Sequence, residues 1–281
     1  MKIQITLSAE AGKRLIIQAV LQLPQVQTAL QSHQLIIKGG TTASIAAETL
    51  CGTPLKICGR LTAKGAGTLS QNCSAPHSIL LKNGEVAARD AEIWDGRISF
   101  SRGDVCIIGA NIVDRDGRAA MLSGSPLGNA LHFFTALPSE GVEMIVAAGL
   151  EKWAPCSLDD AMSACSRSGF DLSMGMPCGL IPIPGKVIDE TEACRILGAS
   201  DVQIIARGGI CGGEGGCTLA VTFDDEDAGQ AFFQTVQKLS RPQNQAPAGS
   251  ADSLTDCLST HCAPSAALHS SCWYRAHRNE V

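Results

Sequence analysis

Two short stretches of this chain carry the residue types best suited to bind a charged small molecule. The first is Gly39-Gly40-Thr41-Thr42, which lies between an apolar run at 35–37 and a helix-like segment from Ala43. A tight turn of this kind presents free backbone N–H groups and two hydroxyls at a helix start, where the dipole favours an anion. The pattern predicts that Gly39, Gly40, Thr41 and Thr42 bind a phosphate or carboxylate.

The second stretch follows another apolar run, at 104–109. It reads Gly109-Ala110-Asn111, with Asp114 and Asp116 a few residues later. In open α/β sheets, ligands bind outside the carboxyl ends of the strands. We therefore expect Gly109 and Asn111 to contact the ligand. A carboxylate within hydrogen-bond reach of a substrate can transfer a proton, which makes Asp114 and Asp116 the candidate catalytic residues.

A second glycine-rich loop at 123–129 precedes a helix-like stretch at 130–137. We expect Ser123, Gly124 and Ser125 in this loop to close the far side of the same pocket. The sequence indicates no metal ligands and no cofactor for this site.

Three other side chains leave two interpretations open. His132 follows the second loop and is either a site residue or part of the helix packing. Cys178 either faces the pocket or is a buried structural thiol. Arg207 ends a predicted strand and either binds a ligand anion or forms a surface ion pair. The segment 208–217 that follows contains six glycines in its first nine residues, which suits a lid, a thiol pair or a long hairpin loop.

Composition limits the partners. The chain has 281 residues, a formal net charge of -5 and no cluster of Lys and Arg, so a nucleic-acid partner is not expected. No apolar run approaches the ~20 residues that span a bilayer, so no membrane partner is expected either. The 13 Cys are scattered, which indicates reduced thiols and a cytoplasmic location. The predicted partner is a small anionic metabolite, and homo-oligomerisation is left open.

The order of the elements predicts an α/β fold with an open, mostly parallel sheet and helices on both faces, followed by a smaller α+β, ferredoxin-like unit. The first domain covers 1–150, and the second covers 151–240. Beyond residue 241 the composition turns to Gln, Ala, Pro and Ser, which predicts a poorly ordered tail over 241–281. Strands are expected at 3–7, 35–37, 55–58, 104–109, 142–148, 202–207 and 218–223, and Asn83-Gly84 predicts a hairpin.

A strand, Gly-Gly-Thr-Thr and a helix, followed by a strand that ends in Gly-Ala-Asn-x-x-Asp, resemble the superfamily of ribose-5-phosphate isomerases, glucosamine-6-phosphate deaminases and CoA transferases. The resemblance covers about 34–150 and implies a fold of this class with a phosphorylated sugar or CoA ester as ligand. The isomerases carry a similar Gly-Ala-Asp element that contacts the sugar. This chain has Ile108 where the isomerases have an acid, and Asn111 where they have Asp. The loop at 123–129 also lacks the isomerase lysine, and no motif marks Glu140 or Glu143 as a transferase nucleophile.

These observations predict a protein that binds a small phosphorylated or carboxylated metabolite or a CoA-type ligand. If it is an enzyme, it is expected to be an isomerase or a transferase. Two alternatives stay open: a non-catalytic metabolite sensor or assembly module, and a thiol or iron-sulfur protein using Cys178, Cys211 and Cys217.

Overall fold

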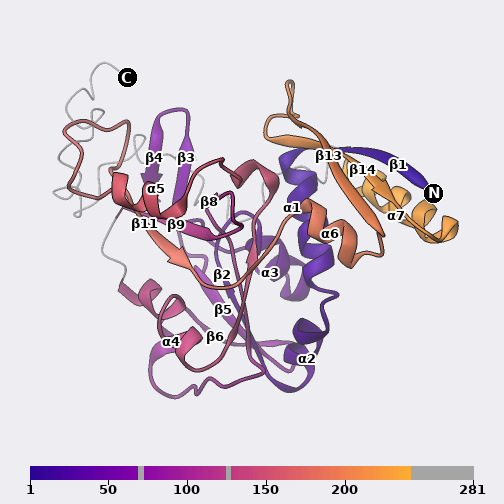
Figure 1. Cartoon of the computed structure of the whole chain (residues 1–281). Coiled ribbons are helices and arrows are strands. Elements are labelled where there is room, and N and C mark those ends of the chain that lie inside the picture. The colour runs from indigo at the N-terminus through magenta and orange to yellow at the C-terminus, as the bar shows by residue number, and fades with distance from the viewer. Residues whose placement is uncertain (69–72, 125–127, 242–281) are drawn as a thin grey trace.

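The computed structural model describes residues 1–68, 73–124 and 128–241 (Figure 1). The predicted α/β class is confirmed, because the chain forms a mixed six-stranded sheet with helices packed against it. The predicted tail, from residue 242 on, and Ser125 lie outside the described residues. Within the described part of the chain, no helix is long and apolar enough to cross a membrane.

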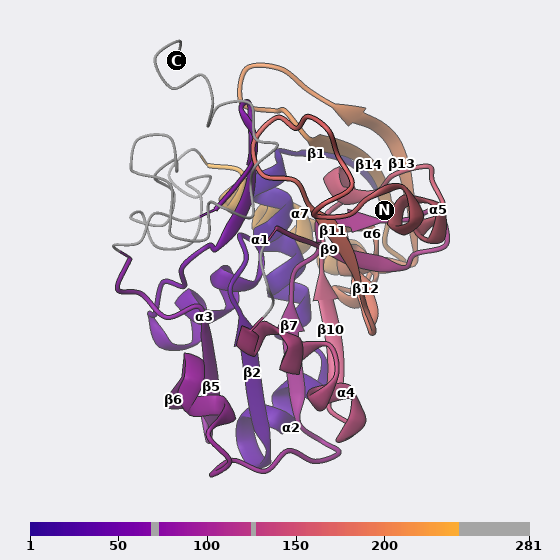
Figure 2. The same cartoon turned by 90° about the vertical axis from the view of Figure 1, so that its left-hand side faces the viewer.

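The six-stranded sheet has the order β12-β10-β7-β2-β5-β6 (Figure 2). Neighbouring strands are parallel from β12 to β2, whereas β5 and β6 run antiparallel. Their bounds are β2 (Gln34–Lys38), β5 (Ser78–Lys82), β6 (Glu85–Arg89), β7 (Val105–Ile108), β10 (Glu143–Ala147) and β12 (Lys186–Ile188). The sheet is therefore mixed, with its parallel half carrying β2 and β7 side by side.

The central strands are buried on both faces, which explains their continuous apolar sequences. On β2, Leu35 and Ile37 face one core, and Ile36 faces the other. The first core contains α1 (Ala9–Val20), α2 (Pro24–Ser32) and α3 (Ala43–Cys51). The second contains the short helices η1 (Asp90–Trp94), η2 (Gly128–Phe133) and α4 (Ala136–Ser139).

The predicted hairpin at Asn83-Gly84 is confirmed between β5 and β6. Asn83 has φ 52° and Gly84 has φ 78°, as a two-residue turn with both central residues in the left-handed region requires. The predicted strand at 55–58 is wrong. That segment buries Leu55 and Ile57, but it pairs with no strand in the described chain.

A second sheet joins the two ends of the described chain. Its order is β1-β14-β13, and β1 pairs antiparallel with β14 from Lys2↔Thr222 to Leu7↔Cys217. This pairing joins strands from both sides of residue 150, where the sequence predicts a domain boundary. Strand β12, which follows residue 150, likewise pairs with β10 in the large sheet. The remaining bounds of this layer are β1 (Lys2–Leu7), α6 (Glu190–Ile196), β13 (Asp201–Gly208), β14 (Gly216–Thr222) and α7 (Glu226–Leu239).

Two smaller sheets and two short helices lie near the carboxyl ends of the central strands. One sheet has the order β11-β9-β8, and the other is a two-stranded hairpin. The bounds are β3 (Gly59–Thr62), β4 (Gly65–Thr68), β8 (Ile112–Val113), β9 (Ala119–Ser123), η3 (Leu150–Lys152), α5 (Leu158–Ala164) and β11 (Gly179–Ile183).

The first residue of α6, Glu190, is a buried acid with an unusual protonation equilibrium. Its side chain is 2% exposed, and Oε2 accepts a hydrogen bond of 2.7 Å from the backbone N–H of Leu150. Burial and the nearby charge of Glu151 raise the pKa of Glu190 from 4.5 to about 7, although the bond from Leu150 acts in the opposite direction. Glu190 is therefore largely protonated below pH 7 in the folded state.

This protonation makes the stability of the fold depend on pH. Between pH 4.5 and 7 the unfolded chain releases the Glu190 proton while the folded chain retains it, so stability falls as pH rises through this window. We expect Glu190→Gln, which keeps an acceptor for Leu150, to raise the melting temperature at pH 8 but not at pH 4. The exposed residue Glu85 provides the control, Glu85→Gln. An equal response of both variants at pH 8 would contradict the assignment.

Candidate functional site

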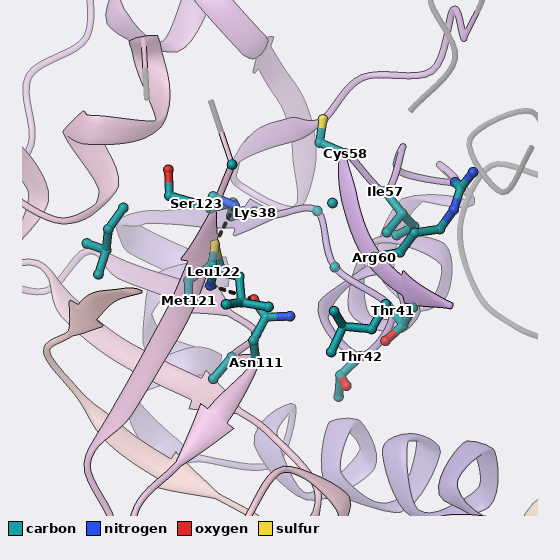
Figure 3. Close-up of a pocket in the computed structure, with 18 of the residues that line it drawn as sticks. Lys38, Thr41, Thr42, Ile57, Cys58, Arg60, Asn111, Met121, Leu122 and Ser123 are labelled. Atoms are coloured by element: carbon teal, nitrogen blue, oxygen red, sulfur yellow. Dashed lines mark hydrogen bonds between the residues drawn. The ribbon is translucent and has the colours of Figure 1, made fainter. Parts of the chain in front are cut away.

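A pocket of about 390 Å³ lies at the carboxyl ends of β2 and β7 (Figure 3). The glycine-threonine turn after β2 forms one side, and the end of β7 with β9 forms another. Of the sequence-predicted ligand-binding residues, those that line the pocket are Gly39, Gly40, Thr41, Thr42, Gly109, Asn111, Ser123 and Gly124. The structure thus brings together the two stretches that the sequence places 70 residues apart.

The turn after β2 depends on its two glycines in different ways. The backbone N–H of Gly39 donates to the carbonyl of His77 at 2.6 Å. A Cβ at Gly39 would lie 2.6 Å from the carbonyl oxygens of both Lys56 and His77, so the close approach of three backbone segments requires glycine. A Cβ at Gly40 would meet no atom within 4 Å. A small side chain at Gly40 would therefore meet no steric conflict at its Cβ.

The opposite wall is fixed by Asn111. Its backbone N–H donates to the carbonyl of Ala120 at 2.9 Å, and its Oδ1 accepts from the backbone N–H of Leu122 at 3.0 Å. These bonds join the end of β7 to β9, which carries Met121 and Ser123 into the pocket (Figure 3). No described residue bonds the amide nitrogen of Asn111, which remains able to donate to a ligand oxygen.

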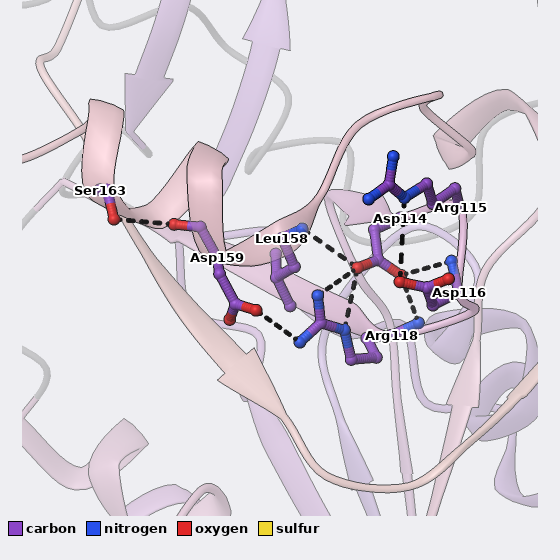
Figure 4. Close-up of polar contacts among 7 residues, drawn as sticks. All are labelled: Asp114, Arg115, Asp116, Arg118, Leu158, Asp159 and Ser163. Carbon is purple, nitrogen blue, oxygen red and sulfur yellow. Dashed lines mark hydrogen bonds and ion pairs between the residues drawn. The ribbon is translucent and has the colours of Figure 1, made fainter.

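Asp114 and Asp116 do not line the pocket. The Asp114 carboxylate is fully buried and accepts backbone N–H bonds from Asp116, Arg118 and Leu158 at 3.0, 2.8 and 3.0 Å, together with an ion pair from the Arg118 side chain (Figure 4). Asp116 is exposed at the tip of the same loop. These contacts favour a structural role for Asp114, and the catalytic role of both residues stays a prediction.

The pocket lining also does not include His132, Cys178 or Arg207, the three side chains for which the sequence leaves two interpretations open. The His132 ring stacks on Trp94, with centroids 4.8 Å apart and an interplanar angle of 17°. Cys178 is buried. The guanidinium of Arg207 donates to the backbone carbonyls of Leu150 and Trp153 and so anchors β13 to η3. Each has a structural contact or position that accounts for it.

The sequence patterns did not identify the basic side chains that line the pocket. Four Lys or Arg residues line it: Lys13, Lys38, Arg60 and Lys152. Among the described residues, no Asp or Glu lines the pocket. Lys13 forms an ion pair with Glu10, and Lys152 lies 3.9 Å from the carboxylate of Glu151. The one local signal was Lys38, a charged residue at the end of an otherwise apolar strand and directly before the glycine turn.

Lys38 differs from the other basic residues because it is buried without a carboxylate partner in the described chain. Its side chain is nearly inaccessible, at 4% exposure. The amine lies 3.5 Å from Sδ of Met121 and 5.8 Å from the centre of the Phe133 ring. Burial lowers the pKa of Lys38, and nearby thiols, those of Cys58 and Cys106, offset this only in part.

The thiol nearest to a histidine in this pocket is not activated. Sγ of Cys58 lies 3.3 Å from Nδ1 of His77, and Nδ1 also lies 3.1 Å from the carbonyl of Lys56. Because a carbonyl only accepts, Nδ1 carries the proton and cannot take one from the thiol. Burial and the charge of Lys38 lower the pKa of His77 to about 4, and burial raises that of Cys58. Both groups are therefore neutral at pH 7, which disfavours thiolate catalysis at Cys58.

The cysteines of the thiol or iron-sulfur alternative do not gather in one environment. Cys178 and Cys217 are buried, whereas Cys211 is exposed. Burial raises the pKa of both Cys178 and Cys217. Within the described ranges, no group of three or more His, Cys, Asp or Glu side chains is arranged to hold a metal ion.

Comparison of the chain with family models, with curated proteins and with solved structures found no match. The resemblance to the sugar-phosphate isomerase and CoA transferase superfamily therefore stays a prediction from the two motifs.

Proposed function

We propose that this protein binds a small metabolite that carries a phosphate or a carboxylate, in the pocket between the turn after β2 and the end of β7. The observation that carries the proposal is the set of four basic side chains, with no acid, among the described residues of the lining. Among the described residues no carboxylate pairs with Lys38, so an anionic ligand that binds beside its protonated form gains a charge-assisted interaction in a partly desolvated site.

The neutral groups of the pocket supply direction as well as charge. The hydroxyls of Thr41 and Thr42 lie at the start of α3, where the helix dipole favours negative charge. The amide of Asn111 faces them from the other wall (Figure 3). A volume of about 390 Å³ is near the lower end of the range for ligand pockets, about 300 to 1,000 Å³. This favours a metabolite of a few carbon atoms, or one end of a CoA-type ligand.

The finer fold and function predictions belong to the same proposal. The resemblance to sugar-phosphate isomerases and CoA transferases supports a reaction of the isomerase or transferase type. The lack of an acidic residue among the described residues of the pocket lining instead favours a second candidate, a non-catalytic metabolite sensor. A two-domain division and a cytoplasmic location remain part of the proposal and are compatible with both candidates.

A substitution at Gly40 tests the anion site. Because Gly40 lines the pocket and a Cβ there meets no atom within 4 Å, we expect Gly40→Leu to reduce the space open to a ligand. For the wild type, inorganic phosphate or ribose 5-phosphate at 100 times its Kd should stabilise the fold by about 2.7 kcal/mol. We expect this stabilisation, measured as a shift in melting temperature, to be lost in Gly40→Leu and reduced in Gly40→Ala. An undiminished shift in a folded Gly40→Leu variant would refute the proposed site.

A further inference from the structure

We propose that Lys38 is a nucleophile that forms a Schiff base with an aldehyde or ketone carbonyl of the anionic ligand. The inference rests on the proposed function, because it takes the same pocket and the same anion for granted. It adds the chemical class of the ligand: a carbonyl compound that also carries a carboxylate or a phosphate.

The position of Lys38 suits a reaction that needs a fixed amine. It is the last residue of β2, which is bonded to β7 on one side and β5 on the other. Residues on such a central strand are held more rigidly than residues on loops. The side chain packs against Met121 and Phe133 and reaches the pocket between β9 and the glycine turn (Figure 3).

The surroundings of Lys38 do not stabilise a permanent ammonium ion as an ion pair would. The described hydrogen bond of the amine goes to a thioether, which is a weak acceptor. The thiols of Cys58 and Cys106 supply no countercharge at pH 7, because burial raises the pKa of both, that of Cys106 to about 12. Lys13 and Lys152, by contrast, are each close to a glutamate. Lys38 is therefore the lysine of the pocket that most readily loses its proton.

A deprotonated amine is what carbonyl addition requires. The lone pair of Nζ attacks the carbonyl carbon, forming a C–N bond and converting the carbonyl oxygen to a hydroxyl. Loss of that oxygen as water, with protons from the amine and solvent, leaves the protonated imine, and no oxidant or reductant is needed. The charge of the imine replaces the charge of the ammonium, and the other basic residues hold the anionic group.

The alternative is that Lys38 only attracts the anion electrostatically. Reductive trapping separates the two roles. Wild-type protein is incubated at pH 7 with glyoxylate and sodium cyanoborohydride, which turns an imine into a stable carboxymethyl amine, and peptide mass mapping locates the adduct. Burial of Lys38 favours its neutral amine, which is the form that adds to a carbonyl. We expect labelling of Lys38 to saturate with glyoxylate and to exceed that of the exposed Lys82.

Two variants and the response to inorganic phosphate complete the test. Lys38→Arg keeps the charge but forms no imine, so it should retain stabilisation by inorganic phosphate while losing the adduct. Lys152→Met should still be labelled at Lys38, at higher glyoxylate concentrations. Labelling mainly at Lys13 or Lys152, or equal labelling of Lys38 and Lys82, overturns the Schiff base. If phosphate stabilises the wild type and no Lys38 adduct forms, the Schiff base fails and the anion site stands. If a saturable Lys38 adduct forms with no effect of phosphate, the imine stands and the phosphate site fails.

Discussion

Replacing Asp114 by alanine is expected to lower the free energy of unfolding by about 3–5 kcal/mol, the range for removing one partner of a buried ionic group. The carboxylate accepts hydrogen bonds from three backbone N–H groups and forms an ion pair with the guanidinium of Arg118. Without the carboxylate these donors have no acceptor. The N–H of Leu158 is then left unsatisfied in a buried position, which costs free energy. Urea denaturation at pH 7 measures the loss.

The neighbouring acid provides a matched control. The side chain of Asp116 is 62% exposed, and its ion pair with the guanidinium of Arg115 is long, at 4.0 Å. Such exposed pairs contribute little, so Asp116→Ala is expected to change the free energy of unfolding by no more than about 0.5 kcal/mol. Similar stabilities of Asp114→Ala and the wild type would contradict the structural role and restore Asp114 as a catalytic candidate. Asp114→Asn should fall between the two, because it keeps one acceptor oxygen but places an amide donor against the remaining donors.

The same carboxylate predicts an acid limit to stability. Burial alone would raise the pKa of Asp114, but the hydrogen bonds from Arg118, Leu158 and Asp116 outweigh it and lower the pKa to about 2. The ordinary value is 3.8, so the stabilisation is complete above that pH and is lost as pH falls towards 2. The difference in stability between the wild type and Asp114→Ala should therefore shrink over this window.

The parts of the fold that sequence could predict are those set by local geometry. Asn83-Gly84 predicts its hairpin because the turn itself demands two residues with positive φ. The glycine-threonine turn is equally local: an apolar strand, two glycines and a helix start within 15 residues. Strands β2 and β7 are parallel neighbours, so their carboxyl ends meet at one edge of the sheet, where ligands are expected to bind. Asn111 lines the pocket at this edge, and its contact with a ligand stays a prediction.

The parts that sequence could not predict depend on long-range packing. The basic lining comes from four segments, α1, β2, β3 and η3, and no pattern in any one of them indicates that they meet. The pattern of residues predicts that Asp114 follows a strand, but it does not predict the direction of the side chain. That direction depends on the hydrogen bond from Leu158, which lies 44 residues away. The pairing of Lys2 with Thr222 is of the same kind.

Replacing Lys38 by methionine is expected to stabilise the protein while it removes the ligand chemistry. Methionine has a similar unbranched shape and can pack against Met121 and Phe133 without burying an amine. Burial lowers the pKa of Lys38 below its ordinary value of 10.5. Below pH 10.5 the amine is therefore protonated more readily in the unfolded chain than in the folded chain. The wild type therefore loses stability as pH falls below 10.5, and the variant lacks this loss.

At pH 7 we expect Lys38→Met to raise the free energy of unfolding by about 1–4 kcal/mol, as when buried charges are replaced by apolar side chains, with a smaller gain at pH 10. Urea denaturation at both values measures the change, and Lys82→Met, at an exposed position, should stay within about 0.5 kcal/mol. The variant should also lose stabilisation by phosphate and the glyoxylate adduct. A gain in stability with a loss of binding is typical of a residue retained for function. Destabilisation at pH 7 would instead show that the contact with Phe133 makes Lys38 a structural residue.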